Sequence, residues 1–469
     1  MAQQTLQTGE SFRDAMGIVA EDGRRSWIYP KKPQGRLTTA RTAVSAVLLL
    51  ILFVTPFVRV DGHPFMLLDI VDRKFILFGA AFGPHDFYLL GLAMIAAIVF
   101  IFLFTTIFGR LFCGWICPQT VLMEMVFRRI DYWIEGNERM QRKLNASPWT
   151  AEKIARKGAK YAAYFAVSFA IANAMLAWII GTDALFRIIG EPVSMHLTGF
   201  TAMLAFTGVF YWIFIWFREQ ACILVCPYGR LQGVMLDPDS IVIAYDHRRG
   251  EPRGHIRRNA ERTTGDCIDC RLCVDVCPTG IDIRNGTQLE CVNCTACIDA
   301  CNRVMEKTGR PRGLIRYASA SGIEKGTGFR LTARAIGYSI VLALLLGVTA
   351  FLVASRNEVD VTLLRTPGMF YQEQPDGRLS NLYDLKLRNK TFEPLEVTLV
   401  LEAPQAGTVT VLGAKPVVPA NDIAEAKLFV ILRRADLHAM NTPVEIGLYA
   451  AGKRIASVST SFLGPVQKQ

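Results

Sequence analysis

The chain has 469 residues, of which 51% are hydrophobic and 20% charged, and it carries a formal net charge of +11. This length allows several domains, and a hydrophobic chain with a basic excess is typical of a membrane protein with basic loops rather than a nucleic-acid-binding protein. All 12 cysteines lie between Cys113 and Cys301, so the long C-terminal part contains no disulfide framework.

The N-terminal segment, residues 1–37, is polar, and basic residues such as Arg24 and Lys31 precede any apolar run. The apolar core of a cleavable secretion signal starts much nearer the N-terminus. We therefore expect residues 1–37 to form a flexible cytoplasmic tail.

Five apolar runs are long enough to cross a bilayer, because a hydrocarbon core of about 30 Å needs about 20 helical residues. They are Thr42–Val60, Phe87–Phe108, Tyr161–Ile180, Leu197–Phe217 and Ala335–Ala354. The first four predict a membrane region over 38–217, and the fifth predicts a final helix within 335–355. The run His63–Phe82 is interrupted by charged residues, so we expect it to be interfacial or re-entrant.

The basic residues of the loops predict the orientation. The segments 1–41, 109–160 and 218–334 hold seven, ten and eighteen Lys or Arg residues, whereas 60–86 and 181–196 hold two and one. Cytoplasmic loops carry the excess of Lys and Arg, so the first three segments are predicted to be cytoplasmic. With five spans, the part after Ala354 lies on the opposite side.

A C-x3-C-P motif occurs twice, at Cys113–Pro118 and Cys222–Pro227, each shortly after the cytoplasmic end of a span. The repetition indicates a duplicated unit of two spans followed by a dithiol. If each segment stays helical, residues four apart share one face, and two sulfurs could converge on a soft metal ion. Proline favours the first helical position, which predicts helices over Gln119–Ile134 and Tyr228–Leu236.

These helices place Cys117 and Cys226 at N-termini, where the helix dipole favours thiolate over thiol. Thiolates select Cu(I), zinc and iron–sulfur clusters. The candidate copper or redox thiols are Cys113, Cys117, Cys222 and Cys226. The alternative is that all four are small buried apolar residues. The spacing leaves open whether they form one site or two.

The stretch Cys267–Cys301 contains two C-x2-C-x2-C-x3-C motifs within the predicted cytoplasmic segment 218–334. Bacterial ferredoxins use this spacing to hold [4Fe–4S] clusters, and the fourth Cys of each motif ligates the other cluster. We predict one cluster on Cys267, Cys270, Cys273 and Cys301. The second is predicted on Cys277, Cys291, Cys294 and Cys297. Two zinc sites or a disulfide framework are the alternatives, but zinc sites usually pair short Cys doublets.

The C-terminal part, 356–469, contains short β-branched runs separated by Gly, Pro, Asn and Asp, which favours a β-sandwich of immunoglobulin type. The predicted strands are Val359–Leu364, Leu382–Leu387, Leu395–Leu401, Thr408–Leu412, Ala426–Leu432, Val444–Tyr449 and Ile455–Thr460. The fold class expected for the whole chain is therefore multi-domain: an α-helical membrane domain, an inserted ferredoxin-like domain with two clusters, and an all-β immunoglobulin-like domain.

With these motifs, the chain resembles the FixG/RdxA/CcoG family of cytochrome oxidase accessory proteins. The resemblance is carried by both C-x3-C-P motifs, by C-P-T-G-I-D-I-R-N-G at 277–286, by Q-L-E-C-V-N-C-T-A-C-I-D-A-C at 288–301 and by N-L-Y-D-L-K-L-R-N-K-T at 381–391. It implies a membrane-bound reductase that converts Cu(II) to Cu(I) during assembly of a cbb-type haem–copper oxidase. It also implies a bacterial inner-membrane location with the immunoglobulin-like domain in the periplasm.

We expect an electron relay in which a cytoplasmic donor reduces the clusters and copper is reduced at the dithiols. The expected partners are the membrane, copper ions, that donor, and the oxidase assembly machinery or copper chaperones; no nucleic acid is expected, and a homo-oligomer is left open. One alternative is a quinol dehydrogenase like the membrane ferredoxins of nitrate and nitrous-oxide reduction, which the β-sandwich disfavours. Another is a non-enzymatic assembly scaffold that senses redox state.

Several other residues are weaker candidates. His63, His85 and His196 could ligate copper or haem, although loop histidines are more often solvated. Asn173 could bond to a neighbouring helix or face a cavity, and Trp115 is expected to be an interfacial anchor. The basic run Arg248–Arg262 is expected to be a solvated face rather than a docking site.

Overall fold

The structure is a computed structural model that describes residues 25–69, 74–83, 86–255, 264–328, 330–368, 370–413, 416–437 and 439–465. The chain divides into two compact units. The first comprises Met1–Pro56 and Ala93–Leu346, and the second comprises Phe57–Leu92 and Gly347–Gln469. Most of the predicted tail, 1–37, and residues 256–262 of the basic run Arg248–Arg262 lie outside the described residues.

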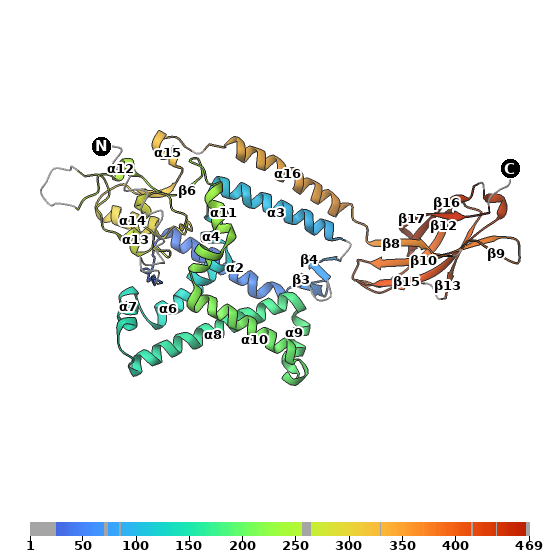
Figure 1. Cartoon of the computed structure of the whole chain (residues 1–469), viewed down its shortest axis with the longest axis horizontal. Helices are drawn as coiled ribbons and strands as arrows, with labels where there is room; N and C mark the ends of the chain where they lie inside the picture. Colours follow the sequence, from blue (N-terminus) through green and yellow to red (C-terminus); the bar gives the residue numbers. More distant parts are fainter. Residues whose placement is uncertain are drawn as a thin grey trace. The chain divides into compact units, whose positions relative to one another are not determined.

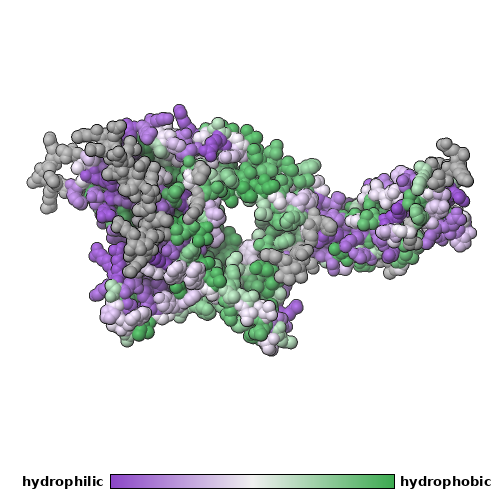
Figure 2. Space-filling view, viewed as in Figure 1, coloured by the Kyte–Doolittle hydropathy of each residue, from purple (hydrophilic) through white to green (hydrophobic). Residues whose placement is uncertain are grey.

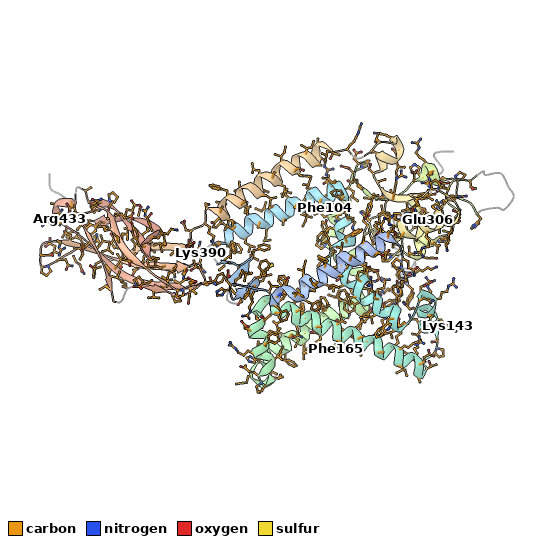
Figure 3. All side chains as sticks on the ribbon, turned by 180° about the vertical axis from the view of Figure 1, so that it is seen from behind. Phe104, Lys143, Phe165, Glu306, Lys390 and Arg433 are labelled. Carbon is orange, nitrogen blue, oxygen red and sulfur yellow. The ribbon has the colours of Figure 1, made fainter. Side chains whose placement is uncertain are left out.

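Five helices are long and apolar enough to cross a membrane (Figure 1). They are α2 (Arg36–Val54), α3 (Phe87–Phe108), α8 (Ala151–Ile180), α10 (Leu197–Trp212) with its π-helical end Ile213–Phe217, and α16 (Ala333–Ala354). Figure 2 shows hydrophobic residues gathered over α3 and α16, and Figure 3 shows Phe104 on α3 and Phe165 on α8. An apolar exterior of this kind suits lipid rather than water.

Two of the predicted boundaries are wrong. The first span begins at Arg36 rather than Thr42 and ends at Phe57, because Pro56 lies in a terminal 3₁₀ turn. The third helix begins at Ala151 rather than Tyr161. Its N-cap is Thr150, whose hydroxyl accepts a hydrogen bond from the backbone of Lys153 at 3.3 Å, so polar turns precede the apolar run.

Each C-x3-C-P segment changes helix type several times. In the first half, α4 (Leu111–Trp115) is followed by α5 (Pro118–Val121), the π-helical Leu122–Phe127, α6 (Arg128–Ile134) and α7 (Glu138–Ala146). After α9 (Thr182–Gly190) and α10, the second half contains the π-helical Ala221–Val225 and α11 (Pro227–Met235).

An aromatic stack joins the two halves of the repeat. The ring of Phe127 lies 4.3 Å from that of Phe214 and 4.8 Å from that of Tyr164, measured between centroids. All three side chains are almost fully buried. The stack packs the helix that follows the first dithiol against α8 and against the end of α10.

The ferredoxin-like region follows α11. Its elements are β6 (Val242–Tyr245), α12 (His247–Gly250), α13 (Leu272–Asp275), the 3₁₀ turn Ile283–Asn285, α14 (Ala296–Lys307), β7 (Ile315–Ala318) and α15 (Ala320–Lys325). Strands β6 and β7 pair antiparallel, with Ile243 opposite Tyr317. Ile243, Met305 and Leu314 are buried with Cys267, Cys273 and Cys297 in one hydrophobic core.

The second unit contains the predicted β-sandwich. One sheet has the order β13 (Thr408–Leu412), β15 (Ile423–Leu432), β10 (Leu379–Asn389), β8 (Val359–Arg365), with β9 (Gln372–Glu373) also on β10; the other has the order β12 (Thr398–Ala403), β16 (Asn441–Ala450), β17 (Lys453–Leu463). A short pair, β11 (Leu395–Glu396) and β14 (Val417–Val418), lies beside them. Alternate residues of β10, such as Tyr383 and Leu387, are fully buried, as the period of a strand requires.

The segment predicted to be interfacial or re-entrant forms short antiparallel strands; among the described residues it contributes no sixth spanning helix, and its interfacial position stays a prediction. They are β1 (Arg59–Val60), β2 (His63–Pro64), β3 (Met66–Asp69), β4 (Lys74–Leu77) and β5 (Ala80–Phe82). These strands contact the sandwich, since the ring of His63 stacks on Phe392 with a centroid separation of 4.2 Å. They therefore belong to the second unit.

Candidate iron–sulfur and dithiol site

The eight ferredoxin-motif cysteines gather around two cavities. The first cavity is lined by the four cysteines predicted for one cluster: Cys267, Cys270, Cys273 and Cys301. The second is lined by the other four, Cys277, Cys291, Cys294 and Cys297. Cys273 borders both cavities, so the two lie side by side. The fold thus brings the last cysteine of each motif to the other motif's cavity.

The backbone of the two motif loops is adapted to an anionic group. Asp269 and Arg271 in the first loop, and Asn293 and Thr295 at the matching positions of the second, all have a positive φ between 53° and 67°. Residues with side chains rarely adopt this conformation. Alternation of such residues turns successive N–H groups towards one point and builds an anion-binding concavity. Thiolate-ligated iron–sulfur clusters fit this environment.

Burial raises the pKa of several of the thiols that line the two cavities. Desolvation raises the pKa of Cys273, Cys291 and Cys301 to about 12 and that of Cys294 to about 11. Such thiols stay protonated at neutral pH, so cluster binding must release their protons. The raised pKa values therefore make the free thiols poorly reactive, and a metal must displace their protons in order to bind.

The C-x3-C-P segments do not form continuous helices, so the expected helical face shared by two sulfurs is wrong. Cys117 and Cys226 adopt extended backbone conformations, with ψ of 123° and 111°, because proline disfavours a helical residue before it. The proline-started helices are confirmed: Cys117 and Cys226 are the N-caps of α5 and α11.

All four dithiol sulfurs lie in one electrostatic neighbourhood. Burial, together with the nearby thiols of Cys117, Cys113 and Cys226, raises the pKa of Cys222 to about 12. Burial likewise raises the pKa of Cys113. Within the part of the chain that the structure describes, no three His, Cys, Asp or Glu side chains converge closely enough to hold one metal ion.

The first dithiol lies against the second cavity. Cys113 is buried in the same cluster as Cys294 and Val292. A Cβ on Gly114 would lie 2.4 Å from the carbonyl oxygen of Val292 and 2.7 Å from that of Asn293. The glycine therefore permits backbone to touch backbone between the dithiol and the cluster loop. Nearby, Gln232 is fully buried, and its Oε1 accepts a hydrogen bond from the Cys113 thiol at 3.7 Å.

Arginine side chains fasten this junction. Arg41, on the first membrane helix, donates from Nε to the Gly114 carbonyl at 2.6 Å, and Arg110 donates to the carbonyl of Leu289 in the cluster segment. Neither residue was predicted. Motif spacing predicts which residues ligate the metal but not which residues hold those ligands in place. The one sequence feature that could have indicated Arg41 and Arg110 is their positive charge beside apolar spans.

Within the described residues, the weaker candidates make other contacts. His196 pairs with Glu191, and His63 stacks on Phe392, whereas His85 lies outside the described residues. Asn173 donates to the carbonyl of Phe169 on its own helix at 2.9 Å rather than to a neighbouring helix.

Trp115 is not an isolated interfacial anchor. Its Nε1 donates to the hydroxyl of Tyr317 at 3.2 Å, and that hydroxyl lies 3.3 Å from the carbonyl oxygen of Asn293. The indole therefore ties the first dithiol segment to β7 and to the second cluster loop.

Comparison with known families agrees with this geometry. Residues 217–320 match a 4Fe-4S dicluster domain, residues 90–141 match a 4Fe-4S binding domain, and residues 349–465 match the "IG-like fold at C-terminal of FixG". Together with the five apolar helices and the two four-cysteine cavities, these matches define a membrane-bound iron–sulfur electron-transfer protein and an oxidoreductase in the general sense.

Similar proteins identify the family. The chain is 32% identical to Protein RdxB of Cereibacter sphaeroides, over 92% of this chain and 95% of that protein, and 35% identical to Protein RdxA of the same organism, over 81% and 82%. It is 33% identical to the nitrogen fixation protein FixG of Rhizobium meliloti, over 83% and 82%. The chain belongs to the FixG/RdxA family.

Proposed function

We propose that this protein is a cupric reductase that converts Cu(II) to Cu(I) and supports assembly of a cbb-type haem–copper oxidase in the bacterial inner membrane. The observation that carries the proposal is the contact between the first dithiol and the second cluster loop, where Cys113 packs with Cys294. A thiolate site beside a redox centre suits copper, because reduction produces the softer ion that thiolates prefer.

The eight cysteines of the two cavities are proposed as the cluster ligands, in the pairing predicted from the motifs. When bound there, [4Fe–4S] clusters supply one-electron transfer, and the protein tunes their potential through burial and hydrogen bonds. The nearby hydroxyl of Thr279, 3.3 Å from the sulfur of Cys277, and the amide oxygen of Asn293, 3.5 Å from that of Cys291, belong to this tuning environment.

The exposure of the cysteines supports an order for the relay. Cys270, at the first cavity, is exposed, whereas Cys113, beside the second cavity, is 6% exposed. We infer that a cytoplasmic donor gives one electron at the first cavity and that Cu(II) accepts one electron at the dithiols Cys113, Cys117, Cys222 and Cys226. One donor electron is consumed for each Cu(I) formed, so the balance needs no further reactant.

The basic loops support a cytoplasmic location for the clusters and dithiols, with the sandwich in the periplasm. The oxidase assembly machinery or copper chaperones are the proposed partners on the cytoplasmic and periplasmic sides of the membrane. Modification of an added cysteine by a membrane-impermeant thiol reagent in intact cells tests this orientation: an added cysteine in the sandwich should react, and one in the ferredoxin-like region should not.

The function is tested with anaerobically purified protein, a chemical reductant, Cu(II) and a chromogenic Cu(I) chelator. Cys113→Ala and Cys222→Ala should each abolish copper reduction while the visible absorbance of the clusters stays at the wild-type level. Wild-type turnover in both variants would remove the dithiols from the reaction.

Two results would favour the other functions. Oxidation of a quinol by the same preparation, without copper turnover, would identify a quinol dehydrogenase. Intact clusters with neither activity would identify a non-enzymatic scaffold.

A further inference from the structure

Arg218 has an unusual backbone conformation immediately before the second dithiol. Its φ is +48° and its ψ is −123°, a combination that disfavours any residue with a Cβ. It connects two π-helical turns, Ile213–Phe217 and Ala221–Val225, and such turns are frequent at functional sites. A strained residue persists only where its surroundings hold it in place.

The equivalent position in the first half of the repeat is a glycine that also has a positive φ. Gly109 has a φ of +55° and lies four residues before Cys113, as Arg218 lies four residues before Cys222. A phenylalanine precedes each of them. Glycine adopts positive φ without steric cost. The turn itself therefore does not explain an arginine at position 218, and the explanation must lie with the side chain.

Arg218 is attached at two points to the segment that follows the first dithiol. Its Nη2 donates to Oδ2 of Asp131 at 2.9 Å, and its carbonyl oxygen accepts from Nε2 of Gln119 at 3.4 Å. Gln119 comes directly after the C-x3-C-P motif, and Asp131 lies on α6. Gln119 and Arg218 also line a small cavity together with Cys222.

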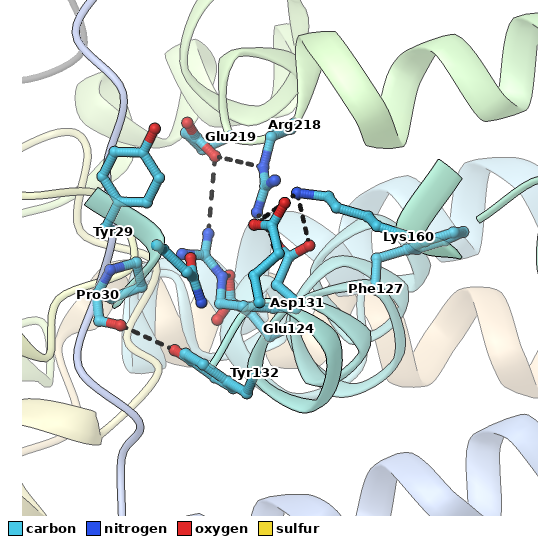
Figure 4. Close-up of polar contacts among 12 residues, drawn as sticks. Tyr29, Pro30, Glu124, Phe127, Asp131, Tyr132, Lys160, Arg218 and Glu219 are labelled. Atoms are coloured by element: carbon cyan, nitrogen blue, oxygen red, sulfur yellow. Dashed lines mark hydrogen bonds and ion pairs between the residues drawn. The ribbon is translucent and has the colours of Figure 1, made fainter. Parts of the chain in front are cut away.

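The ion pair is buried and supported on its far side. The side chains of Arg218 and Asp131 are 7% and 2% exposed. Asp131 also pairs with Lys160 at 2.8 Å (Figure 4). It accepts a further hydrogen bond from the hydroxyl of Tyr164 at 2.8 Å. Burial opposes ionisation of Asp131, but Arg218 and Lys160 outweigh it and lower its pKa to about 2. The carboxylate therefore stays charged at every physiological pH.

We propose that the Asp131–Arg218 ion pair is a positioning device that holds the second dithiol, Cys222 and Cys226, against the first. Buried ion pairs contribute little net stability compared with apolar packing, and fixing one arrangement is their best-attested role. Here the pair connects the two halves of the repeat. Because Arg218 lies only four residues before Cys222, fixing Arg218 also restricts the position of Cys222. The expected effect on copper binding rests on the proposed function, whereas the positioning of the dithiols by the ion pair does not.

The variant Arg218→Gly tests the role of the side chain separately from that of the backbone turn. The substitution introduces the residue type of Gly109 at the equivalent position and removes the strain of a side chain at positive φ. Asp131 keeps its contacts with Lys160 and Tyr164, so folded protein is expected. With the clusters loaded, a bifunctional thiol reagent should cross-link the peptides carrying Cys117 and Cys222 in the wild type and lose this cross-link in the variant. Cu(I) affinity, measured by chelator competition, should fall about tenfold, with unchanged cluster absorbance.

Glu135→Gln is the matched control. It removes a charge from the same buried network, since Glu135 is 1% exposed and pairs with Lys157 at 2.6 Å and with Lys160 at 3.3 Å. It should leave both the cross-link and the Cu(I) affinity unchanged. Equal losses in Glu135→Gln would show that the network is only structural and would overturn the proposal.

Asp131→Asn breaks the same pair from the other side, so the test does not depend on one variant folding. Wild-type cross-linking in either folded variant would also overturn the proposal. Because the cross-link needs no copper, it separates the two hypotheses. A wild-type protein that cross-links but neither binds nor reduces copper would refute the proposed function and leave the positioning role standing.

Discussion

Asp299 caps a membrane helix to which it does not belong. Its carboxylate accepts hydrogen bonds from the backbone N–H and the hydroxyl of Thr38, both at 2.7 Å, in the first turn of α2. The helix has Gly35 at its own N-cap and therefore no side chain to satisfy these groups. Asp299 lies between Cys297 and Cys301, so one residue links the cluster cavities to the first span.

Asp299→Ala should loosen the start of α2, because removing a capping carboxylate costs about 1 kcal/mol. Hydrogen exchange of the amides of residues 37–40 should become faster, and copper reduction should fall while both clusters remain. Asp275→Ala is the control: Asp275 holds the equivalent place between Cys273 and Cys277, but its side chain is exposed. Equal hydrogen-exchange rates of these amides in the two variants would contradict the capping role of Asp299.

Gly114→Ala should separate the first dithiol from the cluster loop, since the new methyl group would clash with the carbonyl oxygens of Val292 and Asn293. We expect copper reduction to slow by about tenfold or more, as misplacement of reacting groups by a fraction of an ångström to an ångström does in other enzymes. The rate is measured with the Cu(I) chelator assay.

Gly208→Ala provides the control for that experiment. A Cβ at Gly208 would meet nothing within 4 Å, and alanine has a higher helix propensity than glycine. The variant should therefore keep the wild-type rate. A wild-type rate in Gly114→Ala as well would mean that the close backbone contact is not needed.

Asp86 should make the second unit acid-sensitive. Its carboxylate pairs with Arg356 at 2.7 Å and with Lys390 at 3.1 Å. Burial opposes its ionisation, but the N–H of Gly83 and these cations prevail and lower its pKa below the ordinary 3.8. A lowered pKa stabilises the folded protein above the unfolded-state pKa, and this stability is lost as the pH falls through the folded-state value.

We therefore expect protection of strands β3–β5 against hydrogen exchange to decline below about pH 4, the ordinary range of an aspartate. Asp86→Asn should show the reduced protection already at pH 7. Asp360→Asn is the control, because Asp360 also pairs with Lys390, at 2.8 Å, but is 35% exposed. A pH profile that Asp86→Asn does not change would disprove the assignment.

Removal of iron should affect one part of the chain selectively. Seven buried or partly buried thiols and the exposed thiol of Cys270 line the two cavities, and a metal site that rarely exists in the unfolded chain contributes its binding energy to folding. After treatment with an oxidant and an iron chelator, amides of 264–318 should exchange faster, while strand β10 should stay protected. Uniform loss of protection would indicate that the two units unfold together.

The sequence alone was sufficient to predict the main elements and the grouping of the eight motif cysteines. Spacing predicts which thiolates a short loop can direct at one cluster, and the same two groups of four cysteines line two cavities; their role as cluster ligands stays a prediction. Composition and periodicity likewise predicted five apolar helices and the seven main strands of the sandwich. The strands at His63–Phe82 were missed because each is short and because charged residues interrupt the apolar run, although their partners are neighbours in the chain.

Only the tertiary structure decided what surrounds those thiols. Nothing in the motif letters places Gly114 against Val292, Asp299 on Thr38 or Arg218 on Asp131, because these contacts join segments that are separated by many residues. Ligand spacing is a local property of the chain, readable from its order. The positions of the supporting charges depend on how the two halves of the repeat pack, and burial then gives each of these contacts its strength.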